Sequence, residues 1–332
     1  MSVLVTGGTG YIGSHIAVTL LEYGFDVVIF DDLSNSSFNT IARIEELSGR
    51  KVSFIRGDIR SNKDVSHVFK NNSVKHVIHL AGLKSVSESL KKPLDYYDVN
   101  LNGTLVLLKE IQKHKIQNVI FSSSATVYGR PQSVPLTEKS PVGGTTNPYG
   151  TSKFLAEKLL EDFASVNKHI NITLLRYFNP VGAHPTGLIG EKPSGVPNNL
   201  VPYLSKVASG KLECLSVFGS DYQTPDGTGI RDYIHVMDLA EGHLSAIINA
   251  NISSNFNVYN LGTGRGYSVL ELIKTFEKVN GVKVNYTLTS RRPGDVDECW
   301  SDSLLAFKEL NWKATRDLAT MLRDAWNWEK LQ

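Results

Sequence analysis

The fold is decided close to the N-terminus, where residues 3–13 read Val-Leu-Val-Thr-Gly-Gly-Thr-Gly-Tyr-Ile-Gly. The apolar run that opens this stretch predicts a buried strand, and apolar side chains at helical spacing as far as residue 23 predict a helix directly after it. Glycine can take positive φ and lets backbone N–H groups approach a phosphate, which the helix dipole also favours. Placed between a strand and a helix, Gly7, Gly10 and Gly13 predict a dinucleotide-binding turn rather than a plain glycine turn.

Apolar runs alternate with amphipathic stretches through the first part of the chain. This alternation predicts an α/β fold, a Rossmann-type doubly wound parallel sheet covered on both faces, over residues 1–180. The strands expected there are 3–6, 27–30, 52–55, 77–80, 119–122 and 172–175, and the helices are 11–23, 38–48, 61–71, 94–115 and 148–167.

The pattern changes after residue 180. Residues 180–202 hold five of the twelve prolines and four glycines, which predicts a long loop. A smaller mixed α/β substrate domain is expected over 181–332, although segment 234–261 could return to the first domain. Its expected helices are 203–210, 234–250, 268–280 and 318–328, and its expected strands are 214–218 and 282–288.

Composition narrows the class of protein. At roughly 150 residues per domain, the 332 residues, 41% of them hydrophobic, predict a globular protein of about two domains. A net charge of +2 gives no case for nucleic acid or an anionic membrane as a partner. No run reaches the ~18 apolar residues of a membrane span, and no signal peptide is expected. Only Cys214 and Cys299 are present, which favours a reducing, cytoplasmic compartment and no metal site.

Two acidic residues follow the next expected strands. Asp31 ends the second strand, where a carboxylate can accept hydrogen bonds from ribose hydroxyls and repel a 2′-phosphate, which favours NAD over NADP. Asp58 follows the third strand and could meet the adenine. The Gly57-Asp58 pair is also ordinary turn chemistry, so a purely structural role is the alternative.

A serine, a tyrosine and a lysine form a candidate catalytic group. Ser124 ends the strand that begins near residue 119, and Tyr149 and Lys153 open the next helix four residues apart, on one face. A free tyrosine has a pKa of about 10. The nearby ammonium of Lys153 and a positively charged nicotinamide should lower that pKa and favour the phenolate. These residue types predict removal of a proton from a sugar hydroxyl, with Ser124 hydrogen-bonded to the reacting oxygen.

These residues, with further motifs, resemble the UDP-hexose 4-epimerases of the extended short-chain dehydrogenase/reductase family. The resemblance runs from residue 3 to about residue 328. It implies an isomerase that inverts C4 of a UDP-sugar through a transient 4-keto intermediate with bound NAD, and a homodimer. The matching stretches are 5–8, 81–84, 122–129, 175–185, 197–200, 227–236 and 291–295.

The resemblance also implies roles by position. The positions matched to the catalytic group are Ser124, Tyr149 and Lys153. Those matched to cofactor contacts are Gly7, Gly10, Tyr11, Ile12, Gly13, Asp31, Asn35, Ser36, Asp58, Ile59, Leu80, Ala81, Gly82, Lys84, Tyr149, Lys153 and Phe178. Those matched to the UDP-sugar are Lys84, Ser124, Tyr149, Asn179, Asn199, Leu200, Ser216, Val217, Phe218, Arg231, Arg292, Asp295 and Cys299. Two arginines among them could neutralise a diphosphate, and the phenyl ring could pack on uracil.

Two positions depart from the family pattern. Position 99 is Val, where many relatives have an Asn near the cofactor, and the adjacent Asn100 is expected to point elsewhere. Cys299 stands where some members carry a Tyr beside the C2 substituent of the sugar. The resemblance therefore implies room for an N-acetyl group, and use of UDP-Glc/UDP-Gal as well as UDP-GlcNAc/UDP-GalNAc. A small buried hydrophobe is the plainer interpretation of Cys299.

Two alternatives remain from the sequence. One is a nucleotide-sugar dehydratase or decarboxylase of the same family, which Ala125 and Thr126 after Ser124 disfavour, because dehydratases generally place acids there. The other is a catalytically silent NAD-binding protein, which the presence of both Tyr149 and Lys153 disfavours.

Overall fold

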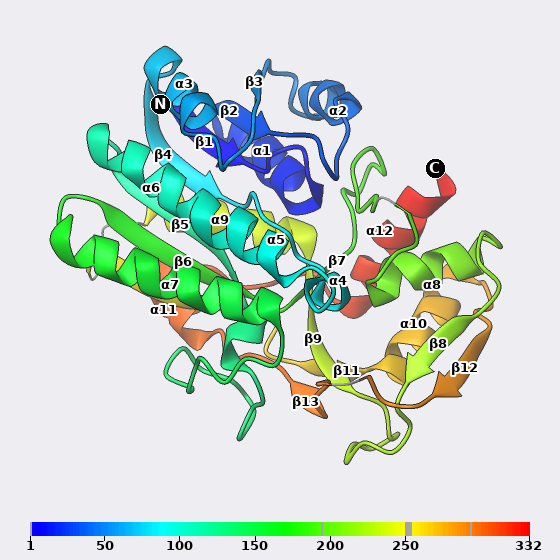
Figure 1. Cartoon of the computed structure of the whole chain (residues 1–332). Coiled ribbons are helices and arrows are strands. Elements are labelled where there is room, and N and C mark those ends of the chain that lie inside the picture. The colour runs from blue at the N-terminus through cyan, green and yellow to red at the C-terminus, as the bar shows by residue number, and fades with distance from the viewer. Residues whose placement is uncertain (1, 194, 250–253, 293) are drawn as a thin grey trace.

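Seven strands form one parallel sheet in the order β10-β6-β5-β4-β1-β2-β3 (Figure 1). The computed structural model describes residues 2–193, 195–249, 254–292 and 294–332. The predicted doubly wound α/β fold is confirmed. The strands are β1 Ser2–Thr6, β2 Asp26–Asp31, β3 Ser53–Arg56, β4 Val74–His79, β5 Asn118–Ser124, β6 Asn171–Tyr177 and β10 Phe256–Leu261.

Helices cover both faces of this sheet because successive side chains of each strand point to opposite sides. Val3 and Val5 of β1 belong to one apolar core, and Leu4 between them belongs to the other. The first core is covered by α1 Tyr11–Tyr23, α2 Asn39–Ser48, α9 Val236–Ile248 and α11 Leu304–Leu310. The second is covered by α3 Asn62–Asn71, α6 Gly103–Lys113 and α7 Pro148–Val166.

The helix expected over 94–115 has a more complex course. Two short helices, α4 Val86–Ser89 and α5 Pro93–Tyr97, lead into a π-helical turn, η1 Asp98–Asn102, and only then does α6 begin. The side chain of Asn100 within that turn donates to Ser152 Oγ at 2.9 Å. A tertiary contact of this kind cannot be read from helical periodicity, and π-turns often occur at functional sites.

The smaller half lies beside the carboxyl ends of the sheet strands (Figure 1). Its apolar core joins α8 Leu200–Ala208, α10 Val269–Asn280 and α12 Leu318–Lys330 to four strands. These strands are β7 Asn179–Val181, β8 Leu215–Phe218, β9 Ile230–His235 and β11 Gly266–Ser268, and two further strands lie outside this core, β12 Tyr286–Thr289 and β13 Glu298–Cys299. A further 3-10 turn, η2 Ala125–Tyr128, follows β5.

Segment 234–261 adds elements to the large sheet. Strand β10 pairs in parallel with β6, from Phe256 opposite Ile172 to Leu261 opposite Tyr177. Helix α9 packs its buried face into the same core as α1. The helix expected over 234–250 ends at Ile248, and its last expected residue lies outside the described residues.

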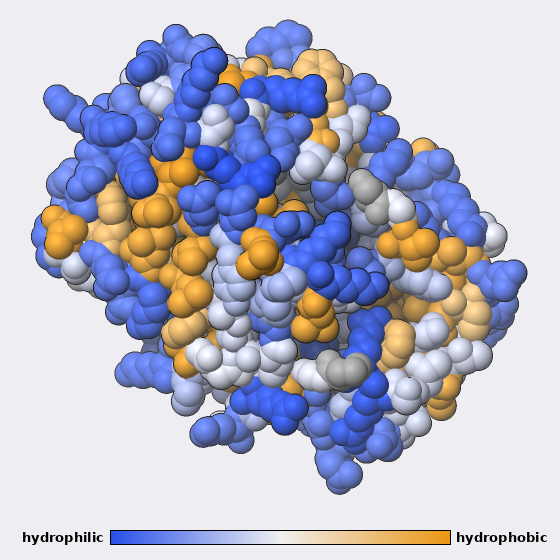
Figure 2. Space-filling model, viewed as in Figure 1, coloured by the Kyte–Doolittle hydropathy of each residue, from blue (hydrophilic) through white to orange (hydrophobic). Residues whose placement is uncertain are grey.

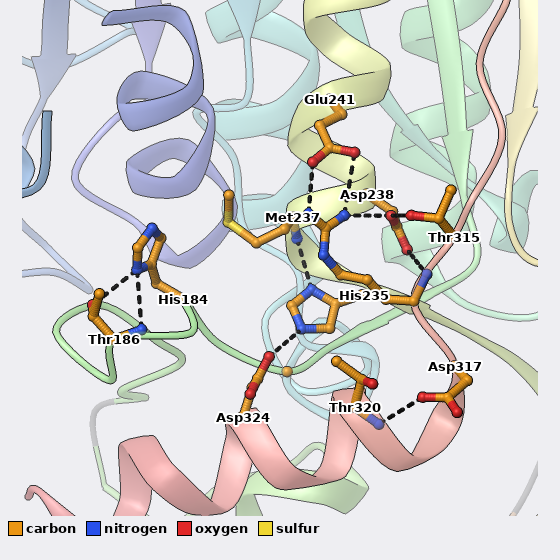
Figure 3. A network of polar contacts seen from close by, with 12 residues as sticks. His184, Thr186, His235, Met237, Asp238, Glu241, Thr315, Asp317, Thr320 and Asp324 are labelled. Atoms are coloured by element: carbon orange, nitrogen blue, oxygen red, sulfur yellow. Dashed lines mark hydrogen bonds and ion pairs between the residues drawn. The ribbon is translucent and has the colours of Figure 1, made fainter. Parts of the chain in front are cut away.

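A polar network fastens α12 and the segment before it to α9 and β9 (Figure 3). His235 Nε2 lies 3.1 Å from Asp324 Oδ2. The buried carboxylate of Asp238 accepts from the backbone N–H of Arg316 at 3.0 Å and from the hydroxyl of Thr315 at 3.1 Å. These contacts connect the small half to the helical layer of the sheet.

Within the four described ranges, no helix is both long enough and apolar enough to cross a bilayer.

Candidate active site

The glycine loop is a tight cradle at the amino end of α1. Gly7 has φ +71°, and a Cβ built on it would lie 2.8 Å from Ala81 N. A Cβ on Gly13 would collide with Gly7 O. Gly10 precedes the helix without a side-chain cap, and the first turn carries no acid. The backbone N–H groups of this turn therefore suit an anionic group such as a diphosphate, and the residues present fit a dinucleotide cofactor.

Asp31 holds the loop that follows β2. Its carboxylate accepts from Thr9 N at 3.1 Å, Leu33 N at 2.9 Å and Ser36 Oγ at 3.1 Å. Ser36 and Thr9 are themselves joined through their hydroxyls at 2.7 Å. Three cofactor candidates, Asp31, Ser36 and the neighbouring Asn35, thus lie together beside the glycine loop. The role of Asp31 toward ribose stays a prediction.

Asp58 and Ile59 have structural partners of their own. Asp58 forms an ion pair with Arg60 at 2.6 Å, and the hydrogen bonds from that guanidinium lower the pKa of Asp58. Arg60 also reaches Asp98 at 2.8 Å. The side chain of Ile59 is buried against Gly103 at the start of α6. The predicted adenine contact stays a prediction, and the turn role weighed as its alternative is present.

The loop after β4 is fastened on both sides. Ala81 N donates to Thr6 Oγ1 at 3.2 Å, and its backbone abuts Gly7. Asn100 exchanges two hydrogen bonds with the backbone of Leu83, at 2.7 and 3.0 Å. Val99 packs against the apolar core. The effect of Val99 on cofactor contacts stays a prediction. The cofactor candidates on this loop are Leu80, Ala81, Gly82 and Lys84.

Tyr149 and Lys153 lie on the first turns of α7. Asn147 caps the helix by accepting from Gly150 N at 2.9 Å, and Pro148 occupies the first helical position. Lys153 Nζ donates to Ser122 O at 2.6 Å on β5, the strand that ends in Ser124. Burial lowers the pKa of Lys153 to about 8. The capped helix start and this contact bring the three catalytic candidates to one place.

Two features of the protein shift the pKa of Tyr149. Burial raises it above its usual value, and a hydrogen bond with Ser124 acts in the opposite direction. Lys153 is engaged by the Ser122 carbonyl and the ring of Phe121, whose centroid lies 4.7 Å from Nζ. The lowered pKa expected from Lys153 together with a positively charged nicotinamide therefore stays a prediction for the cofactor-bound site.

Several candidates for the UDP group lie on β8, on β9 and in the segment that precedes β13. Arg231 on β9 forms an ion pair with Asp295, and its Nη1 donates to Ile230 O at 2.8 Å. The guanidinium carbon of Arg292 lies 4.0 Å from the centroid of Phe218, so it covers one face of the ring that is predicted to pack on uracil. Pro293 of this motif lies outside the described residues.

Cys299 lies on β13 opposite Arg231 of β9. It also packs on the apolar cluster that contains Phe178 and the η2 residues Val127 and Tyr128, directly after Ser124. Burial raises the pKa of the Cys299 thiol to about 11, so the side chain is small and neutral near pH 7. The other sugar candidates take their places on β7, α8 and β8, at Asn179, Asn199, Leu200, Ser216 and Val217.

Sequence reasoning missed Glu191. Its carboxylate accepts from Lys84 Nζ at 2.6 Å and from Asn199 Nδ2 at 2.8 Å, and only 9% of the side chain is exposed. It is an isolated acid in a Pro/Gly-rich loop, so no spacing signal marks it. Metal ligation offers no competing explanation within the described ranges, where no group of three acidic, His or Cys side chains is placed to hold an ion.

The chain is similar over its whole length to known proteins. A family model described as GDP-mannose 4,6 dehydratase matches residues 4–325. The UDP-glucose 4-epimerase of Yersinia enterocolitica is 56% identical over 331 residues, covering 100% of this chain and 98% of that protein.

Solved structures agree with this relationship. UDP-glucose 4-epimerase from Bifidobacterium longum, in complex with NAD+ and UDP, is 51% identical with a TM-score of 0.97, covering 100% of this chain and 98% of that one. The UDP-Glc/GlcNAc 4-epimerase from Campylobacter jejuni is 34% identical with a TM-score of 0.86, covering 100% and 99%.

Proposed function

Since the chain belongs to the UDP-glucose 4-epimerases of the extended short-chain dehydrogenase/reductase family, we propose which residues perform that reaction and which sugars the cleft accepts. The protein is an NAD-dependent UDP-glucose 4-epimerase. A dehydratase is not favoured, although the matching family model carries that name. The turn that follows Ser124 begins with Ala125 and Thr126 and offers no carboxylate there.

Tyr149 takes the proton of the sugar 4-hydroxyl in this proposal. A bound NAD would supply a reversible hydride acceptor for C4 and a positive charge that favours the phenolate. Ser124, beside Tyr149, hydrogen-bonds the reacting oxygen. Lys153 orients the site from its fixed position on Ser122 O.

The proposed reaction requires the nucleotide to be held firmly and the sugar to be held loosely. Arg231 and Arg292, on either side of Asp295, neutralise the diphosphate and keep the nucleotide anchored. The sugar is held loosely, so the 4-keto form can turn about its link to the diphosphate. C4 then presents its other face, and inversion occurs with no net redox change.

The pocket also takes N-acetylated sugars in this proposal. The observation that carries it is the place of Cys299, between the Arg231 strand and the turn after Ser124. A small neutral side chain there leaves space beside C2 of a sugar whose C4 faces Tyr149. A relative titled UDP-Glc/GlcNAc 4-epimerase, 34% identical to this chain, is consistent with such use in this fold.

The test compares wild type, Cys299→Tyr and Cys299→Ala on UDP-Gal and UDP-GlcNAc, with inversion at C4 followed by proton NMR. Wild type and Cys299→Ala should invert both substrates, whereas Cys299→Tyr should invert UDP-Gal alone. Normal turnover of UDP-GlcNAc by Cys299→Tyr would contradict the role of this position. Wild type that inverts only UDP-Gal would contradict use of N-acetylated sugars.

A second copy of this chain is the partner proposed for one exposed apolar face. Leu94 of α5, Leu105 of α6 and Leu155 of α7 are 79%, 37% and 38% exposed. Figure 2 shows apolar side chains gathered in a band over α6 and α7. Contiguous apolar surface of this kind marks an interface, and two-fold pairing of the helices would cover it.

Both cysteines are free, which supports a reducing, cytoplasmic location.

A further inference from the structure

An acidic side chain lies in a cleft that receives anions. The cofactor and the substrate each bring a diphosphate, yet Glu191 stands between their candidate sites with 9% of its side chain exposed. A carboxylate there repels such ligands unless its charge is offset by a paired cation. We propose that Glu191 is a positioning residue that holds Lys84, on the cofactor side, and Asn199, on the sugar side, in one arrangement. This inference rests on the proposed roles of those two residues.

Contacts with Trp328 hold the backbone around Glu191 in place. Gly190 packs flat on the indole of Trp328, where a Cβ would come within 2.5 Å of Cγ. Trp328 Nε1 then donates to Glu191 O at 3.1 Å. The hairpin that carries these residues is closed by the bridge between Ala183 and Gly190. The backbone position from which the Glu191 carboxylate extends is therefore well defined.

Lys84 is the first group that Glu191 positions. Its Nζ lies 2.6 Å from Glu191 Oε1 and 5.8 Å from the ring centroid of Tyr11. Tyr11 opens α1, whose uncapped amino end is the candidate diphosphate site. Lys84 is 48% exposed and has a flexible stem, so without the carboxylate it would sample many rotamers. The ion pair keeps its charge beside the glycine loop.

Asn199 is the second group. It occupies the N-cap position of α8 but makes no capping bond, and it gives its Nδ2 to Glu191 Oε1 at 2.8 Å instead. An amide that donates on one side must present its oxygen on the other. Glu191 thus fixes Asn199 Oδ1 as an acceptor that faces away from the carboxylate, where a sugar hydroxyl can donate to it.

The test uses Glu191→Gln, which keeps the shape but removes the charge, so that the ion pair with Lys84 is lost and the hydrogen bond from Asn199 is weakened. Glu110→Gln is the matched control, because Glu110 is 5% exposed and pairs with Lys113 at 2.7 Å on α6. Two readouts are followed: NAD retained after gel filtration, and kcat and KM for UDP-Gal. Lys84→Met and the double variant complete a double-mutant cycle.

Glu191→Gln should lose bound NAD and raise KM by about 10-fold to 100-fold, the worth of one charged hydrogen bond, with kcat changed far less. Adding Lys84→Met should cause little further loss, because both changes remove the same ion pair. Glu110→Gln should match wild type.

Wild-type NAD retention and KM in Glu191→Gln would overturn the inference, as would full additivity with Lys84→Met. A wild-type protein that fails to invert UDP-Gal would instead contradict the established reaction. Retention of NAD by the variants would still decide the role of Glu191.

Discussion

Lys153 Nζ donates to the carbonyl oxygen of Ser122 at 2.6 Å, so the helix that carries Tyr149 is tied to the strand that ends in Ser124. Only 5% of Lys153 is exposed, and burial lowers the pKa of its ammonium to about 8. The carbonyl and the Phe121 ring offset part of the cost of desolvating this charge.

Lys153→Met should lower kcat on UDP-Gal by ~10²-fold to 10⁴-fold, because the variant removes the cation that orients the acid–base group. Lys158→Met on the same helix is the control, since Lys158 is exposed and pairs only with Glu161 among its described ion-pair partners. Steady-state rates at saturating UDP-Gal provide the measurement. An equal loss of kcat in both variants would mean that disturbance of the helix, rather than loss of the Lys153 ammonium, causes the effect.

Tyr149→Phe should leave UDP binding intact and lower turnover by ~10²-fold to 10⁴-fold, the usual contribution of general acid–base catalysis. The phenyl ring keeps the edge-to-face packing on Tyr96, whose centroid lies 6.3 Å away. Calorimetric titration with UDP and NMR turnover assays separate binding from chemistry. Near-normal turnover would remove Tyr149 from the role of base.

Gly13→Ala should lose bound NAD and melt at a lower temperature, because its Cβ would collide with Gly7 O and force the cradle open. Gly144→Ala is the matched control, since no atom of the described residues lies within 4 Å of the added Cβ. Absorbance of released cofactor and thermal unfolding give the two readouts. A Gly13→Ala variant that retains NAD like wild type would contradict the cradle.

Stability should fall as pH falls below about 6.5. Burial lowers the pKa of His15, His79 and His243 to about 3, 3 and 4. The unfolded chain therefore binds more protons than the folded one below 6.5, and each histidine lowers the free energy of unfolding by about 1.4 kcal/mol per pH unit as acid is added. Above 6.5 their contribution is complete and constant.

Urea unfolding between pH 4.5 and 8 measures this slope. His15→Gln should reduce it by one proton, and His15 is the best choice because its buried Nε2 has no hydrogen-bond partner among the described residues. Exposed His67→Gln should leave the slope unchanged. A His15→Gln slope equal to that of wild type would refute the assignment of a neutral buried imidazole.

Leu155→Glu should convert the proposed dimer to a monomer, because it places a charge at an exposed apolar position of α7, one of the two helices beneath the apolar band. Leu288→Glu is the control, since this residue is 53% exposed on β12 in the small half. Light scattering after gel filtration reports the mass of each. An unchanged dimer in Leu155→Glu would place the interface elsewhere.

Strong periodicity made the sheet half predictable. The helix expected over 11–23 is observed as Tyr11–Tyr23, because its apolar face and flanking glycines agree. Strand β9 escaped prediction because it carries charged residues such as Arg231, and β13 because it has only two residues. They form only when the chain brings them into register with each other.

Some residues of the site could likewise be predicted from the sequence, and others could not. The glycine loop and Tyr149 with Lys153 have local spacing that a sequence reveals. Glu191 has no such spacing, since Lys84 lies 107 residues away and the contact depends on how the loop after β7 packs against Trp328. The raised pKa of Tyr149 also depends on burial, which spacing does not report.

The late return of the chain to the sheet has a consequence for biosynthesis. During translation β6 leaves the ribosome long before β10, so the nascent chain carries an open strand edge beside β6 until its partner arrives. The apolar side of α1 waits for α9 over the same interval. A fragment that stops at residue 180 would keep both surfaces uncovered and tend to aggregate, so the first half matures only when most of the polypeptide has been made.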